Sequence, residues 1–140
     1  MAGYEKVELL YLTPDHYPRL KELMLTCYPK VGDPAWSQEQ VNTLIEKYPE
    51  GQIVVMVDGK MAGAALSILI PYERFDEKHT YIDMTANDTF DTHTSDGDTM
   101  YGLDIMVHPE YRGMRIGRRM YDYRKELCEQ KNLRGIVLGG

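Results

Sequence analysis

The sequence is poor in the residues that define several protein classes. Its 140 residues include two cysteines, Cys27 and Cys128, with no CxxC pair or other metal-ligand spacing, so we predict no disulfide framework and no metal site. No apolar run is long enough to cross a bilayer, and Glu5, Lys6 and Glu8 interrupt any apolar run at the N-terminus. Without a signal peptide or a membrane span, we expect a cytoplasmic protein with no membrane partner.

Several enzyme motifs are missing as well. The sequence contains no Gly-x-Ser-x-Gly elbow, no Walker A lysine and no pair of histidines at metal spacing, so hydrolase, kinase and metalloenzyme chemistry have no support. The formal net charge of −6 also disfavours a nucleic-acid partner, because such proteins carry an extended basic surface. A nucleic-acid-binding module that uses the small arginine cluster is the weakest of the interpretations.

The sequence does have the composition of an ordinary globular domain. Hydrophobic residues make up 43% and charged residues 27% of it, and its length suits one domain over residues 1–140. Residues 71–110 hold ten acids and two bases, whereas residues 111–135 hold eight bases and three acids. This asymmetry suits an enzyme that attracts a cationic amine to one side and a polyphosphate to the other, but solvated acidic loops explain it equally well.

Local patterns predict an α/β protein with a mixed sheet. We expect strands over residues 7–11, 52–57, 60–70, 100–107 and 133–138, and helices over residues 14–27, 38–47 and 116–131. Thr13 and Ser37 are the expected N-caps of the first two helices. Asp58-Gly59 predicts a hairpin turn, Gly63 a close backbone approach or a bulge, and residues 71–99 a long acidic loop, either a lid over the acceptor site or a plain connection.

One stretch, Leu103 to Arg119, combines a strand, a basic turn and the start of a helix. Pro109 cannot donate to a sheet ladder and so ends the strand. The turn and the helix N-terminus direct unpaired N–H groups at one point, which favours an anion. Four guanidinium groups add positive charge there, those of Arg112, Arg115, Arg118 and Arg119. We interpret this turn as a pyrophosphate site; ordinary surface arginines on a Gly-containing turn are the alternative.

The same stretch resembles motif A of the GCN5-related N-acetyltransferases (the GNAT family), with Arg112, Ile116 and Gly117 at the expected positions and Val107 to Gly113 as a typical lead-in. It departs from the motif at Arg115, where the first glycine is expected. The extended stretch more specifically resembles the acetyltransferase-like domain fused to some carbon–nitrogen hydrolases. The resemblance implies a GNAT-like fold and acetyl-CoA as the cofactor, with its pyrophosphate on the turn.

The resemblance also implies which residues bind the cofactor. The backbone of Ile105, Met106 and Val107 would pair with the pantetheine arm, and the turn would contribute Arg112, Gly113, Met114, Arg115, Ile116, Gly117 and Arg118.

For catalysis, strict alternation predicts that Leu103, Ile105 and Val107 share one face of the strand and that Gly102, Asp104 and Met106 share the other. Asp104 is then the first candidate for the general base and His108 the second. The N–H of Met106 or of Val107 could stabilise the oxyanion. A small-molecule or peptide amine is the implied acceptor, so we predict an N-acetyltransferase. The alternative is a non-catalytic domain that binds CoA or docks a partner at the front of a longer amidohydrolase-type protein.

The end of the sequence carries a further expectation. Members of the resembled family continue with a helix and two strands, and a tyrosine in that helix often protonates the leaving thiolate. The sequence stops at Gly140, so we expect a C-terminally incomplete fold, either a piece of a longer protein or a chain whose sheet a partner completes. An apolar open edge strand is an association site, and we therefore expect a homo-oligomer such as a dimer.

Overall fold

The computed structural model of the chain describes residues 6–28, 36–70, 93 and 97–138. Its elements are, in chain order, β1 (Val7–Tyr11), η1 (Pro14–His16), α1 (Tyr17–Cys27), α2 (Gln38–Lys47), η2 (Pro49–Gly51), β2 (Ile53–Val57), β3 (Lys60–Ile70), β4 (Thr99–Val107), η4 (Pro109–Tyr111), α4 (Ile116–Gln130) and β5 (Gly135–Leu138). Within these residues one sheet has the strand order β1-β2-β3-β4-β5. Its strands are antiparallel except for the parallel pair β4 and β5, so the predicted mixed α/β sheet is confirmed.

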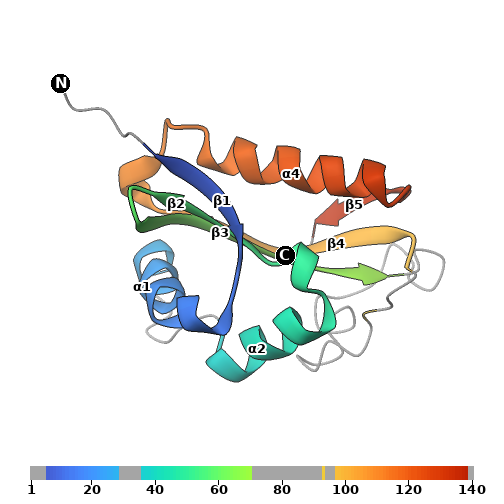
Figure 1. Ribbon diagram of the computed structural model, residues 1–140, viewed down its shortest axis with the longest axis horizontal. Coiled ribbons are helices and arrows are strands. Elements are labelled where there is room, and N and C mark those ends of the chain that lie inside the picture. Colours follow the sequence, from blue (N-terminus) through green and yellow to red (C-terminus); the bar gives the residue numbers. More distant parts are fainter. Residues whose placement is uncertain (1–5, 29–35, 71–92, 94–96, 139–140) are drawn as a thin grey trace.

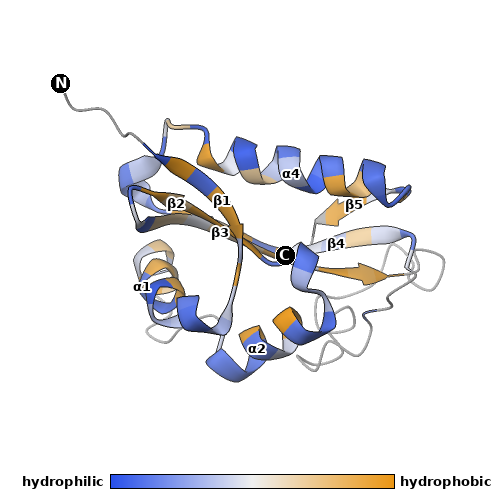
Figure 2. Ribbon diagram, viewed as in Figure 1, coloured by the Kyte–Doolittle hydropathy of each residue, from blue (hydrophilic) through white to orange (hydrophobic). Residues whose placement is uncertain are grey.

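Two helical layers enclose the sheet. Helix α4 lies on one face, and α1 and α2 lie on the other (Figure 1). Strands β2 and β3 are buried along nearly their whole length and are strongly hydrophobic (Figure 2), as expected for central strands covered on both sides. None of the helices in the described residues is both long enough and apolar enough to cross a membrane.

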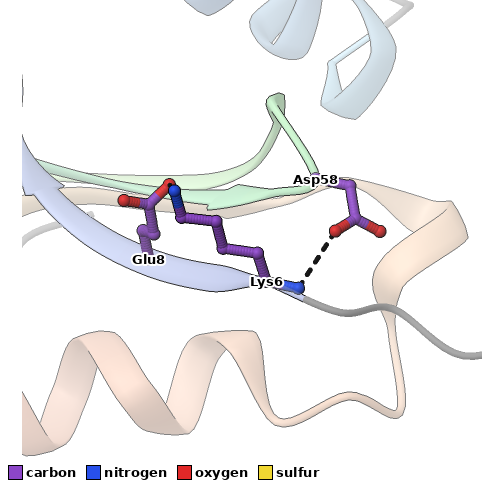
Figure 3. A network of polar contacts seen from close by, with 3 residues as sticks. All are labelled: Lys6, Glu8 and Asp58. Atoms are coloured by element: carbon purple, nitrogen blue, oxygen red, sulfur yellow. Dashed lines mark hydrogen bonds and ion pairs between the residues drawn. The ribbon is translucent and has the colours of Figure 1, made fainter.

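The hairpin between β2 and β3 turns at Asp58 and Gly59, as predicted. Both residues have positive φ, 50° and 83°, which suits the two-residue turns that join twisted antiparallel strands. The turn is tied to the start of β1, because the Lys6 amide donates to the Asp58 carboxylate at 3.0 Å and the Asp58 amide donates to the Lys6 carbonyl at 2.9 Å. Figure 3 shows this contact beside the exposed Lys6–Glu8 ion pair.

The predicted helix starts are confirmed in position. Ser37 caps α2, since its hydroxyl accepts from the Gln40 amide at 3.1 Å while the Gln40 side chain accepts from the Ser37 amide at 2.8 Å. Thr13 forms the equivalent box with His16 at η1, which leads directly into α1. These caps satisfy N–H groups that have no acceptor within their own helix.

Gly63 brings β3 and α4 into close contact. A Cβ atom at this position would lie 2.7 Å from Ile116 Cγ2 and 2.9 Å from Met120 Cε. The pairing of β2 with β3 also shifts between Val55 and Met56, opposite Gly63 and Met61. Both parts of the prediction for Gly63, the close approach and the irregular register, are therefore confirmed.

The strict alternation predicted for β4 is wrong. Gly102 pairs with Ser67 and Asp104 pairs with Leu66, so Leu103 has no partner in β3 and forms a β-bulge. The extra residue turns Leu103 into the core beneath α1 and α2, together with Met106, whereas Val107 packs with the core beneath α4. A bulge shifts the side-chain alternation by one residue, which no count along β4 alone reveals.

The long acidic segment predicted over residues 71–99 falls mostly outside the described residues. His93 is described, and its Nδ1 accepts from the Leu69 amide at 3.0 Å at the edge of β3. Its ring stacks on Tyr48 with a centroid distance of 5.3 Å. Burial and then the positive charge of Lys47 lower the pKa of His93. The neutral imidazole thus acts as an acceptor for a strand amide.

Candidate active site

The stretch between β4 and α4 forms a tight basic turn. The short helix η4 begins after His108, whose Nδ1 accepts from the Glu110 amide at 3.1 Å. Gly113 has a φ of 92° and Arg115, the N-cap of α4, has a φ of 60°. Two left-handed residues reverse the chain here and point the first turn of α4 back toward the end of β4.

The turn leaves a set of backbone N–H groups unpaired. Met114 donates to Tyr111 and Arg119 to Arg115. Among the residues that the structure describes, no acceptor faces the amides of Gly113 and of residues 115–118. Unpaired amides at the N-terminus of a 15-residue helix favour an anion, because their partial positive charges add to the helix dipole. The arrangement that the sequence predicted for a pyrophosphate is present.

The arginines of the turn differ in their surroundings. Arg118 Nε donates to the Asp122 carboxylate at 3.1 Å along the exposed side of α4. Arg112 and Arg115 are exposed, and neither forms an ion pair with another described residue. These two side chains can therefore reach a ligand on the turn without first breaking a contact.

Strand β4 has an open edge beyond the bulge. It pairs with β5 only from Thr99 to Gly102. From Asp104 to Val107 it has β3 on one side and no described strand on the other. The His108 amide donates to the Ala62 carbonyl of β3 at 2.8 Å, so by alternation the peptide groups of Ile105 and Val107 point to the open side. An extended chain of amide groups could pair with this edge as an added strand would.

Asp104 is partly exposed beside this edge, and three donors hold its carboxylate. Oδ1 accepts from the Tyr28 hydroxyl at 2.7 Å and from the Ile105 amide at 2.8 Å, and Oδ2 accepts from the Trp36 indole N–H at 3.0 Å. Tyr28 is the C-cap of α1 and Trp36 precedes α2, so both helices on this face contribute. A carboxylate has about four acceptor positions, which leaves Oδ2 able to accept one more donor.

Arg124 supports the same residue from the opposite layer. Its side chain is buried in α4, and its Nη2 donates to the Leu66 carbonyl at 2.8 Å and to the Asp104 carbonyl at 3.0 Å. These two carbonyls flank the bulge in β3 and β4. Burial lowers the pKa of Arg124 to about 10, and the negative charge of Asp104 opposes that shift. The guanidinium thus satisfies backbone oxygens at the bulge.

Cys27 attaches the end of α1 to the open edge of β4. Its half-buried thiol donates to the Val107 carbonyl across 3.4 Å. Burial, more than any nearby charge, raises the pKa of this thiol, whereas the guanidinium of Arg112 lowers it. The protonated thiol acts here as a weak donor.

His108, the second candidate for the base, faces a different cleft. Its ring packs edge-on against Tyr111 at a centroid distance of 5.6 Å. His108 lines a cleft of about 330 Å³ between η4, the turn after β2 and the outer side of α1. The other residues that line this cleft include Arg19, Glu22, Thr26, Lys60 and Glu110. No hydrogen bond joins His108 to the group around Asp104 within the described residues.

The structure thus gathers most of the predicted residues around one strand end and adds three that the sequence analysis did not assign to the site. None of Tyr28, Trp36 and Arg124 is among the site residues that the sequence predicts. Arg124 could have been noticed, because it continues the i, i+4 series of Ile116 and Met120 on the core side of α4. No cluster of three or more potential metal ligands occurs in the described part of the chain.

Comparison with known proteins relates the chain to one family. The model of the acetyltransferase (GNAT) family matches residues 17–139. The probable hydrolase YhcX of Bacillus subtilis (strain 168) is 38% identical over 122 residues, which are 87% of this chain but 23% of that protein. The uncharacterised N-acetyltransferase YkwB of the same organism is 28% identical over 139 residues, 98% of this chain and 62% of that protein.

The chain therefore spans less than two thirds of the length of either relative. Among solved structures, the GphF GNAT-like decarboxylase in complex with isobutyryl-CoA superposes with a TM-score of 0.69 at 17% identity, over 83% of this chain and 56% of that one. At this identity the match describes the fold alone.

Proposed function

This chain belongs to the GNAT acetyltransferase family, and on that premise we propose that it is an N-acetyltransferase that moves an acetyl group from acetyl-CoA to an amine. The observation that carries the proposal is the continuous path from the open edge of β4 to the unpaired amides at the start of α4. We further propose that the protein acts in the cytoplasm, where its thiols Cys27 and Cys128 stay reduced.

The turn is the proposed site of the pyrophosphate. The amides of Gly113 and of residues 115–118 supply fixed donors, and Arg112 and Arg115 supply charge. A doubly charged linkage suits this combination, because charge-assisted hydrogen bonds to a phosphate add to the helix dipole. Met114, Ile116 and Gly117 complete the backbone of the turn, and Arg118 lies one step further along the helix.

The pantetheine arm is proposed to lie along the open edge of β4. An amide N–H of the arm would donate to the outward carbonyl of Ile105, because the Ile105 N–H already donates to Asp104 and the Val107 carbonyl already accepts from Cys27. The peptide of Met106 faces β3. This placement brings the thioester next to Asp104. Of the two oxyanion donors expected from the sequence, the N–H of Val107 is favoured, since it points to the open side.

Asp104 is the proposed general base. Its Oδ2 retains an acceptor position for an N–H of the acceptor amine, and the three donors fix its orientation. The carboxylate forms no ion pair with a described residue, so an ammonium group would also be attracted to it. His108 lies in a separate cleft and is the less favoured candidate.

Calorimetric titration with acetyl-CoA tests the cofactor site. We expect binding by the wild type and a loss of affinity of about 2–4 kcal/mol in the double variant Arg112→Ala/Arg115→Ala, because two charge-assisted donors are removed. Arg19→Ala is the matched control, as this arginine lines the other cleft. Equal affinities in the double variant and the wild type would remove the pyrophosphate site from the proposal.

A second candidate function is a non-catalytic CoA-binding or docking domain. The observation that favours it is that one relative, a probable hydrolase, is matched over only 23% of its length. Release of the CoA thiol in the presence of a panel of primary amines separates the two functions. Turnover supports the transferase, whereas binding of acetyl-CoA with no turnover of any amine supports the docking domain.

A further inference from the structure

Aminolysis of a thioester requires two proton transfers. The attacking amine loses a proton, and the departing thiolate gains one. In the proposed function Asp104 accepts the first proton. A second group must supply the other, and it must lie at the end of the thioester that points toward the open edge of β4.

Tyr28 lies where such a donor is needed. Its hydroxyl is 2.7 Å from Asp104 Oδ1, and the same oxygen accepts from the Ile105 amide at 2.8 Å. The phenol therefore lies beside the first outward peptide group of the open edge. The preceding residue, Cys27, contacts the Val107 carbonyl, so the last two residues at this end of α1 span the edge from Asp104 to Val107.

We propose that Tyr28 is the general acid of the reaction and that it forms a proton relay with Asp104; this inference rests on the proposed function. The amine nitrogen bonds to the carbonyl carbon, and the amine proton passes to Asp104 Oδ2. With Asp104 protonated, the Tyr28 hydroxyl turns away from Oδ1, the carbon–sulfur bond breaks, and this hydroxyl gives its one proton to the departing sulfur. The proton on Asp104 then replaces the one that Tyr28 gave, through water, because the carboxylate is partly exposed. Amine and thioester become amide and thiol, and both side chains return to their starting states.

The electrostatics of the pair support this order of events. Burial raises the pKa of Tyr28 first, and the hydrogen bond and negative charge of Asp104 raise it further. Once Asp104 holds the amine proton, its contribution disappears, so Tyr28 becomes a stronger acid at the moment when the thiolate forms. The other ionisable groups that interact with the pair are the Cys27 thiol on α1, which acts on Tyr28, and Arg124 on α4, which interacts with Asp104; Arg112 on the turn acts on Cys27.

The first test uses free CoA bound to the full chain and needs no acceptor. A pH titration that follows the thiolate absorbance reports the pKa of the bound thiol. When the bound thiol ionises, the Tyr28 hydroxyl turns from Asp104 Oδ1 to the thiolate and stabilises it, so Tyr28→Phe should raise that pKa by about one unit. Tyr17→Phe is the matched control, because this phenol also lies on α1 but donates to the Trp36 carbonyl at 2.8 Å; its titration should coincide with the wild type.

The second test uses acetyl-CoA with whichever primary amine of the panel is turned over. Tyr28→Phe should lower kcat by about a hundredfold, as expected for loss of a general acid, and leave the KM for acetyl-CoA unchanged. If Tyr28→Phe does not fold, Asp104→Asn serves instead, since its amide oxygen still accepts from Tyr28. That variant should lose turnover and should lower the pKa of the bound thiol, because Tyr28 is a stronger donor once the negative charge of Asp104 is gone.

The outcomes separate the relay from the proposed function. A wild type that binds neither acetyl-CoA nor CoA overturns both. Binding of CoA with the same thiol titration in the wild type, Tyr28→Phe and Tyr17→Phe overturns the relay and leaves the cofactor site standing. A titration shifted only in Tyr28→Phe supports the relay, even where the acceptor is not among the amines tried.

Discussion

Two charged side chains, Asp104 and Arg124, meet at the same residue of β4 from opposite faces of the sheet. Asp104 accepts three hydrogen bonds on one face of the sheet, and the buried Arg124 donates to the carbonyl of the same residue from the other layer. A buried guanidinium is costly unless its N–H groups find acceptors. The carbonyls of Leu66 and Asp104, which flank the bulge at Leu103, are the acceptors for Arg124 Nη2, whereas the buried Nε has no hydrogen-bond partner among the described residues.

His93 allows a prediction at the residue scale. Burial lowers its pKa in the folded chain, whereas the unfolded chain titrates near pH 6.5. Below about pH 6.5 the unfolded chain therefore binds a proton that the folded chain does not. The free energy of unfolding should fall as the pH decreases from about 6.5 to the folded pKa and should not depend on His93 above that window.

The measurement is urea unfolding between about pH 5 and pH 7.5 in the wild type and in His93→Asn. The asparagine amide oxygen can still accept from the Leu69 N–H, so the variant keeps the contact without the titration. We expect the free energy of unfolding to change with pH more steeply in the wild type than in His93→Asn, by up to about 1.4 kcal/mol per pH unit. Identical slopes would show that His93 does not couple to folding.

At the scale of helices and strands, the features that the sequence predicts correctly are those set by residues close together in the chain. The caps at Thr13 and Ser37, the turn at Asp58 and the strand–turn–helix order around Pro109 all follow from local geometry, and the structure has them. The bulge at Leu103 depends instead on how β4 registers with β3. That register depends on contacts between strands far apart in the chain, so alternation along β4 gave the wrong faces.

The candidate site divides in the same way. The basic turn is contiguous in the sequence, so its amides and arginines could be predicted together. Tyr28, Trp36 and Asp104 meet only because α1, the start of α2 and β4 pack against one another. Nothing in the spacing of these three residues indicates their contact. Asp104 was identified from its place in the strand, but its partners were not.

The turn before α4 gives a prediction at the element scale. Arg115 has a φ of 60°, a conformation that costs a residue with a side chain about 1–2 kcal/mol and a glycine nothing. Arg115→Gly should therefore raise the free energy of unfolding by about 0.5 kcal/mol, after the greater flexibility of glycine in the unfolded chain is counted. It should also weaken acetyl-CoA binding, because a cation is lost.

Gly113→Ala is the opposing control on the same turn. Its φ is 92°, and a Cβ atom there would meet nothing within 4 Å, so any destabilisation comes from the backbone alone. Thermal unfolding of both variants tests whether the positive φ values at residues 113 and 115 cost stability. A destabilised Arg115→Gly, or an unchanged Gly113→Ala, would contradict the assignment of strain to these φ values.

At the scale of the whole molecule, the sheet has two outer strands. Among the described strands, β1 and β5 each pair on one side only. Leu10 and Tyr11 on β1 are 38% and 56% exposed. Unpaired edge strands associate readily with further strands. We propose that β5, with the apolar sequence Gly-Ile-Val-Leu, is the edge through which the chain forms a homodimer, and not β1.

Sedimentation velocity over a range of protein concentrations tests this proposal. Gly135→Lys places a charge at the start of β5, where a side chain meets nothing within 4 Å, and it should shift the population to the monomer. Tyr11→Lys on β1 is the matched control and should leave the dimer intact. A monomer at every concentration, or dissociation by Tyr11→Lys alone, would contradict the assignment to β5.

In the proposed function, the half-open edge of β4 couples the stability of the fold to cofactor binding. Beyond Gly102, where the pairing of β4 with β5 ends, the proposed cofactor would lie where a further strand would pair and would contact outward peptide groups of β4. A ligand that binds only the folded state adds stability that rises with the logarithm of its concentration. In the proposed function, bound acetyl-CoA would therefore raise the free energy of unfolding of this domain.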